Sequence, residues 1–245
     1  MPPIRDATVL VIGGSSGIGY GVAKLCLSEG ATVHIASSNP ARITESVESL
    51  KQTIPNARVS GHVCDLASQE VEAHLTTVFE AVGGPLDHIV FTAGGKIPIT
   101  PISDITLDAI QCAGHIRFAV PILLGKLAQR YLQPGYRSSL ILTTGSVSTK
   151  PFPNWSLITG YTTGLHGTTR SLALDLKPLR VNLVSPGAVD TPLWGPDGVP
   201  KGAENATALG KVGTIDEVAE AYVYLMKDTN ATGSCIDTNG GSLLL

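Results

Sequence analysis

Short apolar runs alternate with longer amphipathic segments along the chain. The apolar runs are rich in Val, Ile and Leu, have the length of buried strands, and cover 7–12, 32–36, 58–63, 88–92, 139–143, 181–184 and 235–238. The segments between them have helical spacing, at about 20–28, 41–53, 68–82, 104–132, 156–176 and 215–227. This alternation predicts an α/β fold with one doubly wound parallel sheet, a Rossmann fold in three layers, α/β/α.

Two local signals refine this prediction. Thr214-Ile-Asp-Glu217 has the spacing of a capping box, which predicts where the last helix begins. The segment at about 187–213 is rich in Gly and Pro and has no periodicity. Long loops at the carboxyl end of such a sheet usually close over a ligand, so we expect a substrate lid here.

Composition favours a single domain over 1–245. A chain of 245 residues with 43% hydrophobic and 15% charged residues suits one large buried sheet. The net charge of −3, without a basic cluster, argues against nucleic acid as a partner. No apolar run reaches the length of a membrane span and the N-terminus lacks a signal pattern, so we expect a cytoplasmic protein without a membrane partner.

The four cysteines are far apart, and none forms the CxxC pairing that indicates a metal site. Each lies in an apolar segment: Cys26, Cys64, Cys112 and Cys235. We therefore predict reduced thiols in the core and no metal.

A glycine-rich turn, Gly13-Gly-Ser-Ser-Gly17-Ile-Gly19, joins the first predicted strand to the first predicted helix. Glycines at such a turn permit a tight bend and a close approach of the backbone to pyrophosphate, while the helix N-terminus offers free N–H groups. The spacing and its context predict a dinucleotide cofactor. The predicted contacts in this turn are Gly13, Ser15, Ser16, Gly17, Ile18 and Gly19.

The end of the second predicted strand indicates which dinucleotide binds. NAD-specific folds place an acidic residue here, to accept a hydrogen bond from the ribose 2′-hydroxyl. This chain has Ser37, Ser38 and Asn39, followed by Arg42, and no acid. These groups accommodate a 2′-phosphate, so we predict NADP(H). The alternative for Arg42 is a surface residue at a helix N-terminus.

Further segments resemble motifs of one enzyme family. They are Cys64-Asp65-Leu66, Thr92-Ala93-Gly94-Gly95, the segment from Arg180 through Pro186-Gly187 to Val189 and Thr191, and 232–241. Together with the glycine turn, they make nearly the whole chain similar to a short-chain dehydrogenase/reductase. The resemblance implies that the first of these segments contacts adenine. It also implies that Ala93, Gly94 and Gly95 contact the cofactor, and that the segment from Pro186 to Thr191 receives the nicotinamide.

The chain departs from this family at the catalytic residues. In the register of 170–182, the family's catalytic tyrosine falls at Ile158 and its lysine at Thr162. The serine falls at Gly145 and the helix asparagine at Gly114. All four catalytic residues are therefore predicted to be absent.

Tyr161 offers an alternative register, because Ser148 precedes it by a spacing typical of the family. In that register Leu165 replaces the lysine. Without a neighbouring cation a tyrosine has little tendency to relay a proton at neutral pH. Tyr161 also lies about 60° around the helix from Ile158, and we favour a packing role for it.

The same register places four polar residues near the nicotinamide end or the substrate, and we take them as catalytic candidates: Arg117, Thr144, Ser146 and Thr162. Each has an alternative role. Arg117 could pair with an acid such as Asp108, and the three hydroxyls could bond backbone groups.

Segments 142–146, 150–155 and 158–161 are similar to fungal alkaloid-pathway members of the family, which also lack the catalytic residues. Some of those reduce an iminium with NADPH and then shape an intramolecular Diels–Alder cyclisation. Arg117 lies in a segment that resembles their functional arginine segment, whereas Phe152 stands where they have an aspartate. This departure puts a cyclase activity in doubt more than cofactor binding.

Three functional hypotheses follow. The first is an NADP(H)-dependent reductase of an imine, an iminium or a carbonyl group in a secondary metabolite, because hydride addition to an iminium needs no proton donor. The second is a redox-neutral isomerase or cyclase on the same scaffold, and the third is a non-catalytic NADP-binding protein. The resemblance also implies that long helices in 116–132 and 156–176 pair subunits, so we expect a homodimer or homotetramer with a small-molecule substrate.

Overall fold

The computed structural model describes residues 1–95 and 97–245. Among these residues, seven strands form one parallel sheet in the order β3-β2-β1-β4-β5-β6-β7. Each strand lies within two residues of its predicted range, and the α/β fold with a doubly wound sheet is confirmed. The strands are β1 (Thr8–Ile12), β2 (Thr32–Ser37), β3 (Arg58–Val63), β4 (His88–Phe91), β5 (Ser139–Thr143), β6 (Arg180–Pro186) and β7 (Cys235–Thr238).

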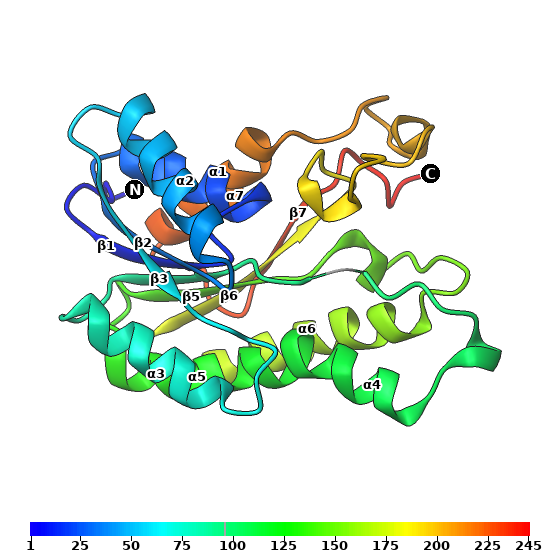
Figure 1. Ribbon diagram of the computed structural model, residues 1–245, viewed down its shortest axis with the longest axis horizontal. Coiled ribbons are helices and arrows are strands. Elements are labelled where there is room, and N and C mark those ends of the chain that lie inside the picture. The colour runs from blue at the N-terminus through cyan, green and yellow to red at the C-terminus, as the bar shows by residue number, and fades with distance from the viewer. Residues whose placement is uncertain (96) are drawn as a thin grey trace.

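Helices cover both faces of the sheet, as Figure 1 shows. One layer consists of α1 (Gly17–Ser28), α2 (Pro40–Thr53) and α7 (Ile215–Lys227). The other consists of α3 (Val71–Val82), α4 (Leu107–Gly114), α5 (Val120–Tyr131) and α6 (Ser156–Asp175). Apolar side chains from each layer and from the facing side of the sheet form two buried cores. The predicted capping box at Thr214 and Glu217 is present and begins α7.

The sheet reverses its winding direction between β1 and β4. The chain passes from β1 outward through β2 to β3, returns to β4 on the other side of β1, and continues to β7. The connections that leave β1 and β4 therefore go to opposite sides, which opens a crevice at the carboxyl ends of these strands. The residues that follow β1, β4, β5 and β6 meet at this edge.

The predicted helix over 104–132 is helical from Leu107 to Tyr131, but a π turn that the sequence does not predict interrupts its α-helical geometry. The segment consists of α4, a π-helical turn (His115–Ala119) and α5, preceded by a short 3₁₀ turn (Ile102–Asp104). A π turn inserts an extra residue into a helix and rotates the side chains that follow it, and such turns are frequent at functional sites. Arg117 lies in the middle of this turn.

The expectation about membrane-spanning length also needs correction. Leu107–Tyr131, taken as one helical segment of 25 residues, is long and apolar enough to cross a membrane by length and composition alone. Helices in the cores of soluble proteins pass the same test. Here Val120, Leu124 and Ala128 of this segment pack against the sheet in a buried core.

The cysteine prediction holds for three of the four residues. Cys26 and Cys64 are buried and Cys235 is half-buried, and burial raises the pKa of the Cys26 thiol to about 12. Cys112 is exposed on α4, contrary to the prediction. Apolar neighbours in sequence do not bury Cys112, because only Ala113 and Gly114 of α4 are buried.

A buried arginine joins β6 to the end of α7. Arg180 is 2% exposed, and its guanidinium donates to the backbone carbonyls of Tyr136, Arg137, Leu225, Met226, Asp228 and Ala231. Burial of His88 lowers the pKa of its side chain to about 3, and the positive charge of Arg180 contributes to this shift. His88 is therefore neutral. Arg180 therefore fixes the segment after α7, which leads into β7.

We expect Arg180→Met to lower the free energy of unfolding by about 3–5 kcal/mol, because it leaves several buried carbonyls without donors. Urea denaturation measures this change. The matched control is Arg58→Met, which removes an exposed ion pair to Asp6 at 2.9 Å and is expected to cost less than about 1 kcal/mol. Equal losses in the two variants would contradict a structural role for Arg180.

Candidate functional site

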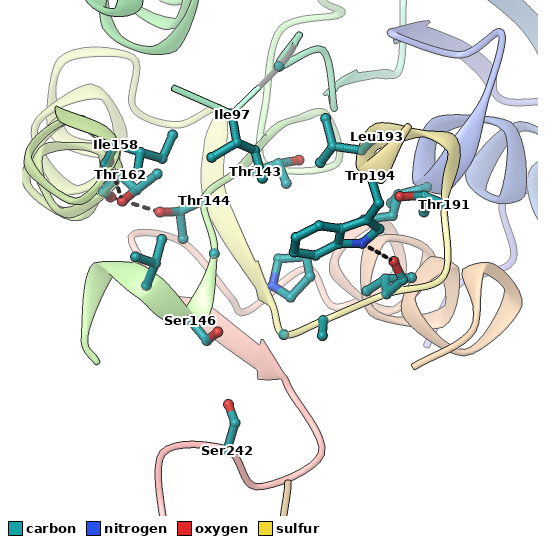
Figure 2. Close-up of a pocket in the computed structure, with 18 of the residues that line it drawn as sticks. Ile97, Thr143, Thr144, Ser146, Ile158, Thr162, Thr191, Leu193, Trp194 and Ser242 are labelled. Carbon is teal, nitrogen blue, oxygen red and sulfur yellow. Dashed lines mark hydrogen bonds between the residues drawn. The ribbon is translucent and has the colours of Figure 1, made fainter. Parts of the chain in front are cut away.

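A cavity of about 560 Å³ lies at the carboxyl edge of the sheet. Its walls come from the segments after β4, β5 and β6, from α6, and from the long connection between β6 and α7. Figure 2 shows side chains from these elements directed into the same space. A cavity of this size suits a small molecule together with part of a cofactor.

The glycine turn lies at one side of this cavity, between β1 and α1. Gly13 has φ of +93°, and a Cβ on it would lie 2.6 Å from the backbone nitrogen of Ala93. A Cβ on Gly19 would collide with the Gly13 carbonyl oxygen and with Thr92 Oγ1. A Cβ on Gly17 would contact Thr191 at 3.4 Å. The turn therefore requires glycine, and the absence of side chains leaves a cradle at the N-terminus of α1.

The end of β2 lies beside the end of β3, because the Cys64 N–H donates to the Ser37 carbonyl at 2.8 Å. Ser38 and Asn39 are exposed at this edge. The Asn39 side chain caps α2 by accepting from the Arg42 backbone N–H at 3.0 Å. Arg42 is exposed in the first turn of α2, which is compatible both with binding a 2′-phosphate and with the alternative of a surface residue.

The motif Cys64-Asp65-Leu66 divides between core and surface. Cys64 and Leu66 are 2% and 8% exposed and pack in the core beneath the sheet, so they can offer only backbone atoms to a cofactor. Asp65 is exposed, and its carboxylate accepts from the Ala67 N–H at 2.9 Å. Of the three side chains, Asp65 alone can reach a ligand.

The residues predicted to receive the nicotinamide end come together in the cavity. The lining from these segments comprises Ile18, Ala93, Gly94, Gly95, Pro186, Gly187, Val189 and Thr191. Gly187 packs closely on the segment after β7, since a Cβ on it would lie 2.8 Å from Asn239 Cα. Leu193 and Trp194, in the short 3₁₀ turn (Pro192–Trp194), extend this wall into the predicted lid.

Ile158 and Thr162 both face the cavity from α6, as the register predicts (Figure 2). The Thr162 hydroxyl donates to the carbonyl of Ile158 at 2.8 Å. The Thr144 hydroxyl, on the segment after β5, donates to the Thr162 carbonyl at 2.7 Å. Both threonines thus line the cavity, but their protons are bound to helix carbonyls, which was the alternative role considered for them.

Tyr161 points away from this cavity. Its hydroxyl donates to the Ile110 carbonyl on α4 at 2.8 Å. Its ring fills the space beside Gly114, where a Cβ would lie 2.6 Å from the ring. Ser148, its partner in the alternative register, lies within hydrogen-bond distance of His166 Nε2 at 2.9 Å. Tyr161 therefore packs α6 against α4 and does not reach a ligand in the cavity.

Arg117 enters the cavity from the π turn, and its guanidinium donates to the Gly95 carbonyl at 3.3 Å. Burial lowers the pKa of this side chain. The contact joins the π turn to the segment after β4, on the side where the nicotinamide is predicted to bind. Ser146 also lines the cavity, from a 3₁₀ turn (Ser146–Ser148).

Sequence reasoning assigned no site role to four cavity residues: Lys150, Trp194, Lys201 and Ser242. Of these, Lys150 begins segment 150–155, which resembles the fungal members. Only the position of the predicted lid pointed to Trp194 and Lys201. Phe152 and Trp155 form an aromatic wall, with ring centroids 5.5 Å apart. The described lining contains three cationic side chains and no Asp, Glu or His.

Comparison with known proteins agrees with this geometry. A family model described as an SDR-like Rossmann domain matches residues 3–245. The protein belongs to the short-chain dehydrogenase/reductase family. This family membership confirms the resemblance drawn from the motifs, and an oxidoreductase scaffold follows from it.

Two similar proteins are fungal. The short-chain dehydrogenase/reductase ATR9 of Stachybotrys chlorohalonatus is 39% identical over 255 aligned residues, which cover 100% of both chains. The solved structure of the MalC reductase/Diels–Alderase from Malbranchea aurantiaca superposes with a TM-score of 0.92 at 39% identity, and covers 99% of this chain and 98% of that one.

A bacterial relative was solved with a cofactor bound. It is a short-chain dehydrogenase from Burkholderia cenocepacia J2315 in complex with NADP, with a TM-score of 0.87 at 27% identity, covering 99% of this chain and 100% of that one. Like this short-chain dehydrogenase/reductase, it has the Rossmann-like fold throughout its length.

We expect Gly19→Ala to weaken NADP⁺ binding, because its Cβ forces the turn away from Gly13 and Thr92. Overpacking of this kind typically lowers the free energy of unfolding by about 1–3 kcal/mol. Calorimetric titration measures the affinity and thermal unfolding measures the stability. The control is Gly167→Ala on α6, where nothing lies within 4 Å and a helix-favouring residue should leave binding unchanged. Wild-type affinity in Gly19→Ala would contradict the assignment of the turn.

Proposed function

We propose that the protein is an NADP(H)-dependent reductase that acts without a tyrosine–lysine pair. The observation that carries this proposal is the position of Ile158 and Thr162. They face the cavity one helical turn apart, at the positions that a proton-donating pair on this helix would occupy. Tyr161 instead donates its hydroxyl to the Ile110 carbonyl on α4.

The residues present fit a dinucleotide. The glycine cradle at Gly13, Gly17 and Gly19 leaves room for pyrophosphate at the N-terminus of α1. Ser37, Ser38, Asn39 and Arg42 would hold the 2′-phosphate, with no carboxylate among them to repel it. Asp65 and the segment from Pro186 to Thr191 would hold the adenine and nicotinamide ends. When bound, NADPH supplies a hydride.

We propose a carbon–nitrogen double bond as the group that is reduced. A hydride and a proton from water convert an imine to an amine, and the proton can be taken up before the hydride arrives. A ketone instead develops an alkoxide during hydride transfer. A general acid positioned to protonate this alkoxide typically raises the rate about 10²–10⁴-fold.

Two steps test this proposal. Calorimetric titration of the purified protein with NADP⁺ and NAD⁺ is expected to show micromolar binding of NADP⁺ and weak binding of NAD⁺. NADPH oxidation is then followed with a cyclic imine, an N-alkyl iminium salt and a ketone of matched shape, and the product mass is measured. A gain of two hydrogens on the imine supports reduction. An unchanged mass would favour a redox-neutral isomerase or cyclase. Binding of NADP⁺ without any turnover would favour a non-catalytic protein.

We also propose that the protein is a homodimer or homotetramer. Large apolar side chains are exposed on α4, on the π turn and on α5, namely Leu107, Ile110, Phe118 and Ile122. Exposed large apolar side chains on successive helical elements favour an interface between subunits. Light scattering after size exclusion is expected to give at least twice the mass of 25.4 kDa, and a monomer would reject the proposal.

Tyr161→Phe is expected to leave the rate of NADPH oxidation with the imine substrate unchanged. The lost hydroxyl donates to the Ile110 carbonyl on α4, away from the cavity. Steady-state kinetics measure kcat and KM for both proteins. If Tyr161 were the proton donor, the rate would fall by about 10² or more, and such a loss would reject a mechanism without this tyrosine.

A further inference from the structure

The second half of the predicted lid rests on the segment after β7. The Leu209 N–H donates to the Gly240 carbonyl at 3.1 Å. A Cβ on Gly240 would lie 3.2 Å from Thr207 Cβ, and a Cβ on Gly241 would lie 2.8 Å from Ala208 Cβ. The backbones of the two segments are therefore in contact, and the absence of side chains on the two glycines makes this close approach possible.

Lys150 holds the same segment from the other side. Lys150 follows the 3₁₀ turn (Ser146–Ser148), and its ammonium donates to the Ser242 carbonyl at 3.1 Å, although 92 residues separate the two in sequence. It also donates to the Leu245 carbonyl. Lys150 is half-buried, which strengthens these charge-assisted hydrogen bonds relative to fully exposed ones. The segment after β7 thus joins Lys150 to the lid, and Figure 1 shows the end of the chain running beside the lid.

The middle of the lid has no comparable support. Within the described residues, the hydrogen bonds of 195–206 all stay inside the lid. The lid is fixed to other segments on either side of this stretch. On one side the Trp194 indole N–H donates to the Val189 carbonyl at 2.9 Å, and on the other 207–209 lie on Gly240. The position of 195–206 therefore depends on these two attachments.

The lid, the segment after β7 and the segment after β5 form one wall of the cavity. Each contributes a residue to the lining, namely Thr207, Ser242 and Lys150, and the lid adds Pro200 and Lys201. A displacement of the segment after β7 would move its support from beneath the lid and so change this wall. The glycine turn lies between β1 and α1, so the cofactor cradle would keep its shape.

We propose that Lys150 is a positioning residue for the lid. By holding the Ser242 carbonyl, it fixes the Gly240–Gly241 support on which 207–209 lie. The lid is thereby kept in one position over the cavity. The proposal rests on the reductase function above for the substrate that the lid covers, but the order of the lid itself can be measured without substrate or cofactor.

The first test is amide hydrogen exchange of the full-length protein, followed by mass spectrometry of peptides that cover 203–212. We expect Lys150→Met to raise the exchange rate of these peptides about 5- to 10-fold, as the loss of a half-buried hydrogen bond to a charged group predicts. Peptides from α2 are the internal reference and should exchange as in wild type.

Three further variants separate positioning from general packing. Lys150→Arg, which can donate to both carbonyls, should exchange as wild type does. Lys150→Gln loses the charge but keeps a donor, so its exchange rate should lie between those of wild type and Lys150→Met. It keeps the test valid if Lys150→Met does not fold. Lys126→Met is the matched control, because it removes a lysine that pairs with Glu72 between α5 and α3, and it should leave the lid unchanged.

The reductase assay gives a second readout. With NADPH and dihydroisoquinoline as the cyclic imine, Lys150→Met should raise KM for the imine about 5- to 10-fold and change kcat less. The Kd of NADP⁺, measured by calorimetric titration, should stay as in wild type. Lys150→Arg should restore the wild-type KM.

The proposal is overturned if peptides 203–212 of both Lys150→Met and Lys150→Gln exchange as in wild type. It is also overturned if the α2 peptides accelerate as much as the lid, since that result indicates general destabilisation. Failure of the proposed function has a different signature, because wild type then binds no NADP⁺ or oxidises no NADPH. A selective acceleration of the lid would in that case still establish that Lys150 positions it.

Discussion

The close approach of the β1–α1 turn to the end of β4 is the contact on which the rest of the site depends. Thr92 holds the end of β4 against β1, with its N–H and its hydroxyl both donating to the Ile12 carbonyl at 2.9 and 3.2 Å. Gly13 and Gly19 lie directly against Thr92 and Ala93, at distances that no Cβ allows. The N-terminus of α1 and the segment 92–95 therefore border one crevice, which lies where the sheet reverses its winding direction.

The chemistry then depends on which face of α6 meets that crevice. Ile158 and Thr162 share the face toward the cavity, and Tyr161 points toward α4. The Thr144 and Thr162 hydroxyls donate to carbonyls of α6, so their protons are already used in hydrogen bonds to the helix. Such a wall can orient a substrate and exclude water. It provides few proton donors, which limits the reactions that the site can accelerate.

The remaining walls come from elements distant in sequence. The π turn brings Arg117 to the Gly95 carbonyl, and Lys150 brings the segment after β7 to the segment after β5. The long connection after β6 adds Trp194, whose indole N–H donates to the Val189 carbonyl at 2.9 Å. Each contact fixes one loop by a backbone carbonyl. The shape of the cavity thus depends on tertiary contacts of loops around a rigid sheet.

The sequence by itself determined the seven strands, the glycine turn, the capping box at Thr214 and the family, because these are local patterns: continuous apolar runs, helical periodicity, backbone freedom at glycine and short motifs. It did not determine the π turn within 104–132 or the exposure of Cys112. It also did not predict the contact between Lys150 and the Ser242 carbonyl. Only the tertiary structure decided these, because side-chain direction and burial follow from packing between elements far apart in the chain.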